Sequence, residues 1–140
     1  GENKVDIIYI DNAVHAHLKA CDALGFGKPT AGKVYFVSDG EPVNLWEWIN
    51  EVLKKTNRVP VSRGISYRTA SRLGCFFESI YNWANIKNEP LMTRFLASQL
   101  ATSHYFNISR ARKDLGYEPV VSPDEGLHRL IQSLSNPQEY

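Results

Sequence analysis

The chain has 140 residues and a formal net charge of +1, with 43% hydrophobic and 22% charged residues. These values predict one soluble, globular domain with a hydrophobic core. A charge this close to neutral argues against a surface for nucleic acid or anionic lipid. No apolar run is long enough to cross a membrane. Two widely separated cysteines, Cys21 and Cys75, favour reduced, buried thiols and a cytoplasmic protein.

The first third of the chain predicts two strands with a helix between them. β-branched and aromatic residues favour a strand over residues 5–10. Asp11 or Asn12 then stands where an N-cap is expected, and a helix follows over residues 13–24. A loop rich in glycine leads to a second strand over residues 33–39. Its almost continuous apolar run is typical of a strand buried on both faces.

The rest of the chain predicts helices. Asn44 caps a helix over residues 45–56, with Glu47 at the capping-box position. An extended connector precedes an aromatic-rich helix over residues 67–86. Three further elements are expected: a helix or helix plus extended segment after Pro90, a short helix capped by Asn107 or Ser109 and ended by Gly116, and a final helix with Ser122 as N-cap and Pro123 first. The expected fold is therefore α/β and mostly helical, with two or three short strands in a single domain over residues 1–140.

Two stretches imitate known sites without their geometry. His15 and His17 are two residues apart on a predicted helix and so point in different directions, whereas a helical zinc pair needs a spacing of four. The stretch "GKPTAGKV" over residues 27–34 is close to a phosphate-binding loop, but it follows a helix and opens a strand. Val34 also stands where the pattern needs serine or threonine. The sequence therefore predicts no metal site and no phosphate loop.

Residues 93–117 mix polar and aromatic side chains with an apolar background, which is the composition of a pocket wall. An amphipathic helix with a polar outer face remains the alternative. Within this stretch Arg94 has apolar neighbours and no acidic residue close by after Glu89. A guanidinium in such surroundings needs a partner. That partner is either a carboxylate from elsewhere in the fold or the polar head of a substrate.

Four segments carry a family resemblance. "DIIYIDNAVHAHLKA", "GKVYFVSDGEPVNLWEWI" and "FNISRARKDLGYEPVVSPDEGL" resemble, in this order, segments of the second half of extended short-chain dehydrogenases/reductases of the 3-beta-hydroxysteroid dehydrogenase branch. The segment "PLMTRFLASQLATSHYFNISRAR" is similar to bacterial members that reduce 2-alkyl-3-ketoacids. Together these segments span nearly the whole chain.

The resemblance implies the C-terminal, substrate-binding part of an NAD(P)-binding, Rossmann-type enzyme. The glycine-rich cofactor fingerprint and the Tyr-x-x-x-Lys pair of the family are absent, since no tyrosine is followed by lysine four residues later. No catalytic or cofactor-binding residue is therefore expected in this chain, and NAD or NADP would belong to the intact enzyme. That enzyme would transfer hydride between nicotinamide and a secondary alcohol or ketone of an apolar substrate. Its expected partners are the missing cofactor domain and a second copy of the chain.

The substrate-binding candidates are the residues that the resembling segments place near a cleft: Tyr9, Met92, Thr93, Arg94, His104 and Tyr105. Two other functions stay open. One is a helical binding or interaction module without catalysis. The other, less favoured, is a lobe of a nucleotide-sugar epimerase or dehydratase, because the chain is richer in aromatic and apolar residues than a sugar-nucleotide site needs.

Overall fold

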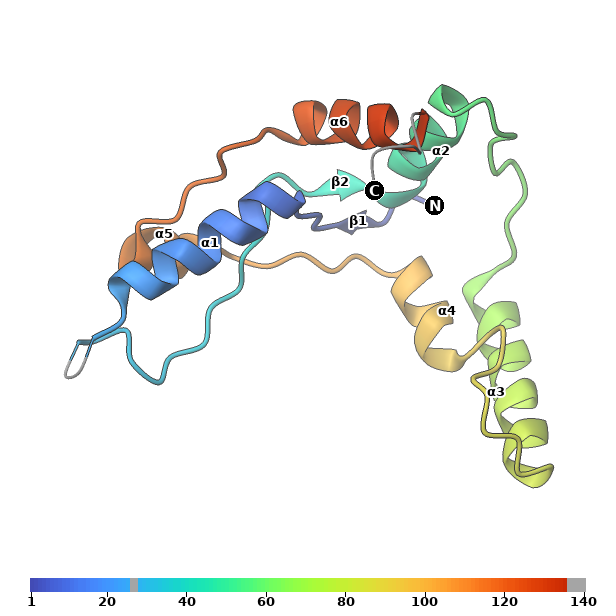
Figure 1. The fold of residues 1–140 in the computed structure, drawn as a ribbon. Coiled ribbons are helices and arrows are strands. Elements are labelled where there is room, and N and C mark those ends of the chain that lie inside the picture. Colours follow the sequence, from blue (N-terminus) through green and yellow to red (C-terminus); the bar gives the residue numbers. More distant parts are fainter. Residues whose placement is uncertain (26–27, 136–140) are drawn as a thin grey trace.

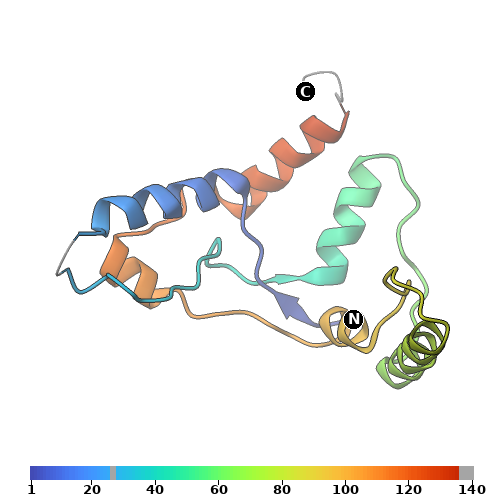
Figure 2. The same cartoon turned by 60° about the horizontal axis from the view of Figure 1, so that its bottom comes forward.

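A computed structural model describes residues 1–25 and 28–135, and Figures 1 and 2 show its arrangement. Within these residues there are six helices and two short strands. In chain order they are β1 (Lys4–Val5), α1 (Ile10–Ala23), β2 (Val43–Asn44), α2 (Leu45–Lys55), α3 (Tyr67–Trp83), α4 (Arg94–Ala101), α5 (Ser109–Leu115) and α6 (Pro123–Ser135). The prediction of a mostly helical α/β chain is confirmed. Gly27, the first glycine of the stretch that resembles a phosphate loop, lies outside the described residues.

The elements form two regions joined by the short sheet. Helices α1 and α5 lie side by side at one end, and α3 and α4 project together at the other (Figures 1 and 2). The hydrophobic core sits in the first region and is made by Ala16, Ile108, Ala111, Leu115 and Tyr117. The second region, which we call the α3–α4 arm, packs its two helices mainly against each other.

The strand predicted over residues 5–10 is mostly absent. Only Lys4–Val5 forms β1, which pairs antiparallel with β2 through Lys4 with Asn44 and Val5 with Val43. A single parallel bridge joins Val5 to His104. The chain leaves the sheet afterwards because the backbone N–H of Tyr9 donates to both carboxylate oxygens of Asp39, each at 3.1 Å, instead of to a neighbouring strand.

The strand predicted over residues 33–39 is also wrong. This segment is extended, but within the described residues it belongs to no sheet. It is not buried on both faces either, because Val34 and Phe36 are 81% and 56% exposed, while Tyr35 and Val37 pack against the core. The Phe36 ring stacks on that of Phe106 with 4.1 Å between centroids. The segment thus has the alternation of a half-buried strand without a partner strand to complete it.

Two further predictions, about the cap of α1 and the burial of the cysteines, fail. Helix α1 begins at Ile10, so Asp11 and Asn12 lie inside its first turn and neither acts as the N-cap. The amide of Asn12 is fully buried and serves the tertiary structure instead. Cys21 and Cys75 are free thiols, but both are exposed and not buried as predicted, because each lies on an uncovered helix face.

Three other signals that act within one turn of a helix are confirmed, whereas the cap predicted for α5 is wrong. The N-cap of α5 is Ile108, because the side chain of Asn107 accepts from the backbone N–H of Ser109 at 2.8 Å and Ser109 is already the first helical residue. The side chain of Asn44 accepts from the backbone N–H of Trp46 and of Glu47, at 3.1 and 3.2 Å, and so caps α2. Ser122 accepts from the backbone N–H of Glu125 and caps α6. Helix α5 ends at Gly116 with a left-handed φ of 64°, which glycine adopts without strain.

Candidate functional site

A groove of about 720 Å³ opens between the first residues of the chain, the connector before α3, and helices α3 and α4. We call it the arm groove. Most of the side chains that line it are apolar, namely Trp46, Val61, Ile65, Tyr67, Ala70, Met92, Ala97, Leu100 and Ala101. Its polar lining consists of Asn3, Ser62, Arg63 and Ser66. A concave, largely apolar surface with a few polar groups is the usual form of a small-molecule site.

Close packing of α3 on the start of α4 sets one wall of the arm groove. A Cβ atom at Gly74 would lie 2.6 Å from the backbone nitrogen of Arg94 and 2.6 Å from the carbonyl carbon of Thr93. Glycine is therefore needed for the approach of the two helices. The hydroxyl of Thr93 then accepts from the backbone N–H of Leu96 at 3.0 Å and caps α4.

Arg94 closes this contact with two bonds to one carboxylate. Its backbone N–H donates to Oε1 of Glu78 and its side-chain Nε–H donates to Oε2, both at 2.7 Å. The backbone bond first, and then the side-chain bond, lower the pKa of Glu78 below its ordinary value. The bond to Glu78 also raises the pKa of Arg94. The partner that the sequence could not identify for Arg94 is thus a carboxylate from α3, sixteen residues earlier.

The opposite wall is tied to the sheet. The indole N–H of Trp46 in α2 donates to the carbonyl of Leu100 in α4 at 3.3 Å. The backbone N–H of Lys4 donates to the hydroxyl of Ser103 at 2.9 Å, just beyond the same helix. Because α4 is fixed to α3 on one side and to α2 and β1 on the other, the arm groove is held open by backbone-anchored contacts.

The six predicted substrate-binding residues do not come together at one place. Met92 lines the arm groove. Thr93 and Arg94 hold its wall through the cap and the ion pair. His104 and Tyr105 lie on the chain beyond α4, where the backbone N–H of His104 donates to the carbonyl of Lys4 at 2.9 Å and the ring of Tyr105 is exposed. Substrate contact by these residues stays a prediction.

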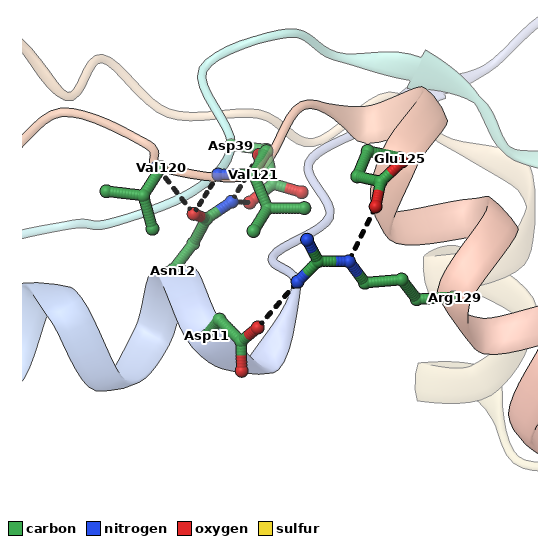
Figure 3. A network of polar contacts seen from close by, with 7 residues as sticks. All are labelled: Asp11, Asn12, Asp39, Val120, Val121, Glu125 and Arg129. Carbon is green, nitrogen blue, oxygen red and sulfur yellow. Dashed lines mark hydrogen bonds and ion pairs between the residues drawn. The ribbon is translucent and has the colours of Figure 1, made fainter.

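Tyr9 lines a different and smaller pocket of about 390 Å³ between α1, α2 and α6. Its ring lies against Gly126, where a Cβ atom would approach the ring to 3.1 Å. The guanidinium of Arg129 lies over the same ring, 5.9 Å from its centroid. It also donates a hydrogen bond to Oδ2 of Asp11, and Figure 3 shows this second contact. The structure therefore assigns Tyr9 to the joint between α1 and α6 and not to the arm groove.

Asn12 is the centre of a buried polar network that sequence reasoning missed (Figure 3). Its Nδ2 donates to Oδ1 of Asp39 and to the carbonyl of Val121, both at 2.7 Å. Its Oδ1 accepts from the backbone N–H of Val120 and of Val121 at 2.8 and 2.9 Å. All four hydrogen-bonding positions of the amide are used, so the network fastens three distant segments and leaves no group free for chemistry.

Asn3 is the second residue that the sequence did not reveal. It is 7% exposed and lines the arm groove, yet neither Nδ2 nor Oδ1 of its side chain has a hydrogen-bond partner among the described residues. The stretch "GENK" is typical of a turn, and nothing in it signals burial. Only the tertiary packing identifies this asparagine.

The two histidines of α1 take part in local contacts. Nδ1 of His17 lies 2.7 Å from the carbonyl of Ala13, and the ring of His15 is 6.3 Å from that of Tyr117. Over the part of the chain that the structure describes, no group of three or more His, Cys, Asp or Glu residues is placed to hold a metal ion. Among the same residues, no helix has the length and apolar character required to span a membrane.

Residues 1–65 match the profile of the 3-beta hydroxysteroid dehydrogenase/isomerase family. Over 95% of its length the chain is 46% identical to the 2-alkyl-3-oxoalkanoate reductase of Stenotrophomonas maltophilia, and over 93% it is 44% identical to that of Shewanella oneidensis. It is also 31% identical over 99% of its length to the decarboxylating sterol-4-alpha-carboxylate 3-dehydrogenase of Schizosaccharomyces pombe.

The chain spans only 40%, 34% and 41% of these three relatives, respectively. No solved structure matches it. The four resembling segments, the family profile over the first 65 residues and the named relatives agree with one another. The chain is therefore a partial region of a protein of the 3-beta-hydroxysteroid dehydrogenase/isomerase branch of the short-chain dehydrogenases/reductases.

Proposed function

We propose that this chain is the substrate-binding part of an NAD(P)-dependent oxidoreductase that acts on a secondary alcohol or ketone of an apolar substrate. The observation that carries the proposal is the arm groove, whose apolar lining and volume of about 720 Å³ suit one small amphipathic molecule. Relatives named as reductases and dehydrogenases support the reaction class. Because the chain is 46% and 44% identical to two 2-alkyl-3-oxoalkanoate reductases, a 2-alkyl-3-keto acid is the first candidate substrate.

In this proposal the chain binds and orients the substrate, and the reaction is completed by residues outside it. The chain contains no Tyr-x-x-x-Lys pair and no glycine-rich fingerprint. The cofactor, NAD or NADP, would be held by the remaining part of the protein, on the Rossmann-type turn that binds a pyrophosphate. Met92 would contact the apolar body of the substrate from the groove wall, while Thr93 and Arg94 keep that wall in place.

An uncovered apolar face supports a cofactor domain as the partner. Ile10, Val14 and Leu18 recur every four residues on α1 and are all exposed, so they form one stripe along the helix. Val34 and Phe36 on the unpaired extended segment are exposed as well. Exposed apolar surface of this extent is typical of an interface. Two free thiols, Cys21 and Cys75, support a reducing, cytoplasmic setting.

Filling the arm groove tests the proposal. Ala101 lines the groove near the end of α4 and is exposed, so Ala101→Phe should obstruct the groove without disturbing the core. In the full-length protein we expect this variant to raise the KM for a long-chain 3-keto substrate about ten-fold or more, as the loss of roughly 1.4 kcal/mol of binding would. The KM for the nicotinamide cofactor and the melting temperature should stay unchanged.

The matched control is Ala84→Phe, which adds the same ring at the exposed end of α3, outside the groove. It should leave both KM values as they are. If Ala101→Phe behaves like this control, the arm groove is not the substrate site. If the full-length protein neither oxidises nor reduces any of a panel of alcohols and ketones with NAD or NADP, a binding or interaction module without catalysis is favoured instead. Turnover of a nucleotide sugar would favour an epimerase or dehydratase.

A further inference from the structure

Asn3 presents a buried amide with nothing to bond. Its side chain is 7% exposed, it lines the arm groove, and both its donor and its acceptor lack partners among the described residues. Buried amides are almost always hydrogen-bonded, because removing them from water without replacement bonds is costly. Both amide atoms are themselves buried, so a ligand in the groove reaches them when the Asn3 side chain turns toward it.

The backbone around Asn3 is fixed independently of its side chain. The carbonyl of Asn3 accepts from the backbone N–H of Leu45 at 3.1 Å. The next residue, Lys4, pairs with Asn44 in the sheet and donates its backbone N–H to Ser103 at 2.9 Å. Bonds on both sides therefore position the amide at the groove wall, whereas the amide itself holds no part of the described structure together.

We propose that Asn3 is the polar anchor of the arm groove and that it binds the head of a long-chain 3-hydroxy acid, an inference that rests on the function proposed above. Nδ2 would donate to a carboxylate oxygen of this ligand, and Oδ1 would accept from its hydroxyl. In a 3-hydroxy acid the hydroxyl oxygen is three bonds from the carboxyl carbon, so an acceptor and a donor lie side by side. The amide of asparagine carries the complementary pair, a donor nitrogen and an acceptor oxygen. The apolar chains would then lie along the apolar lining of the groove.

The charge around the groove favours an acid over a neutral head. Arg63 lines the groove, is exposed at its rim, and takes part in no ion pair with any residue that the structure describes. No aspartate or glutamate is among the lining residues. A carboxylate entering here would meet a cation and an amide donor and no like charge.

Asn3→Asp is the sharpest test, because it keeps the shape of the side chain, removes the donor and adds a negative charge. The full-length protein is titrated with two probes of equal chain length: a 2-alkyl-3-hydroxy fatty acid, and the corresponding secondary alcohol without the carboxyl group. We expect Asn3→Asp to weaken binding of the acid about ten-fold or more, since it loses one charge-assisted bond and gains a repulsion. Binding of the alcohol should change by less than about three-fold. Asn82→Asp, on the exposed face of α3 outside the groove, is the control for added charge and should change neither affinity.

Asn3→Ser separates an anchor from a structural amide. If Asn3 is an anchor, the Asn3→Ser variant keeps the melting temperature of the unmodified protein and loses affinity for the acid but not for the alcohol. If Asn3→Asp and Asn3→Ser instead lower the melting temperature and weaken both probes equally, Asn3 is bonded by another part of the protein and the proposal is overturned. It is also overturned if neither variant changes the affinity for the acid.

The Ala101→Phe variant shows which of the two proposals has failed. When it abolishes binding of both probes while Asn3→Asp affects neither, the groove is the substrate site and only the anchor is wrong. When the unmodified protein binds neither probe, or Ala101→Phe has no effect, the proposed function fails and the anchor fails with it.

Discussion

Asn12 and Asn3 are both buried asparagines, but they lie in different regions of the molecule and differ completely in hydrogen bonding. Asn12, in the region of α1 and α5, makes four side-chain bonds to two other segments, at Asp39 and at Val120 and Val121. Asn3, at the arm groove, makes none within the described residues. A buried amide whose bonds are all used holds a fold together, whereas one with free bonds is suited to hold a ligand. In the proposal made above, the Asn12 network therefore stabilises the first region, and Asn3 binds a ligand in the second.

The largest effect should come from breaking the Asn12 network. Asn12→Leu keeps the volume and apolar packing but leaves the N–H groups of Val120 and Val121 and the carbonyl of Val121 without their partner. We expect the free energy of unfolding to fall by about 3 kcal/mol or more, because several buried polar groups lose their bonds together. Urea unfolding of the full-length protein, followed by far-UV circular dichroism, measures this loss.

The control for that prediction is Asn82→Leu, on the exposed face of α3. A surface substitution of this kind should change the unfolding free energy by less than about 0.5 kcal/mol. A loss of less than about 1 kcal/mol for Asn12→Leu would mean that water or neighbouring groups replace its bonds. The amide of Asn12 would then not be what holds these segments together.

An intermediate effect is expected at Gly74, where α3 meets the start of α4. The added methyl group of Gly74→Ala would lie 2.6 Å from backbone atoms of Thr93 and Arg94, which cannot move aside as a flexible side chain could. The helices must separate, and we expect a loss of about 1–3 kcal/mol in unfolding free energy from overpacking. The same separation should weaken substrate binding in the arm groove, because its wall shifts.

Gly64→Ala provides the matched comparison, since a Cβ atom at Gly64 would have no atom within 4 Å. Stability should then stay within about 0.5 kcal/mol of the unmodified protein. If both glycine variants are equally stable, the two arm helices are free to slide apart. The arm groove would then have no fixed shape on which specificity could be built.

These contacts show which parts of the fold a sequence can predict. The caps at Asn44 and Ser122 and the stop at Gly116 depend on residues within one turn, and the structure confirms them. The strand over residues 33–39 depends on a neighbouring strand, which the described residues do not supply, so its apolar pattern gave the wrong burial. The pattern predicts a strand, but pairing with a neighbouring strand is not a local property of the sequence.

The candidate site was predicted less well for the same reason. Arg94 finds its carboxylate on α3, sixteen residues earlier in the sequence, and that pairing depends on how the two helices cross. Met92 was predicted as a pocket residue and lines the arm groove. Asn3 gave no signal, because its position is fixed by bonds to residues distant in sequence, from Asn3 itself to Leu45 and from Lys4 to Ser103.

The smallest effect concerns Glu78 and acid. The N–H groups of Arg94 stabilise the charged form of Glu78, so its pKa in the folded protein lies below the ordinary value of 4.5. A carboxyl group with a lowered pKa stabilises the fold fully above its unfolded pKa, and this contribution is lost as the pH falls through the folded pKa. We therefore expect the α3–α4 contact to weaken below about pH 4.5 and to be unaffected by pH near neutrality.

The Glu78→Gln variant should melt slightly below the unmodified protein at pH 7, and the difference should shrink as the pH is lowered. Both side chains of the pair are partly exposed, so the shift in melting temperature should be smaller than that of Gly74→Ala. Arg94→Met should reproduce it at pH 7 without changing turnover in the folded fraction. A variant at Arg94 that melts normally but loses kcat/KM for an acidic substrate would contradict this structural role and would show that Arg94 contacts the substrate.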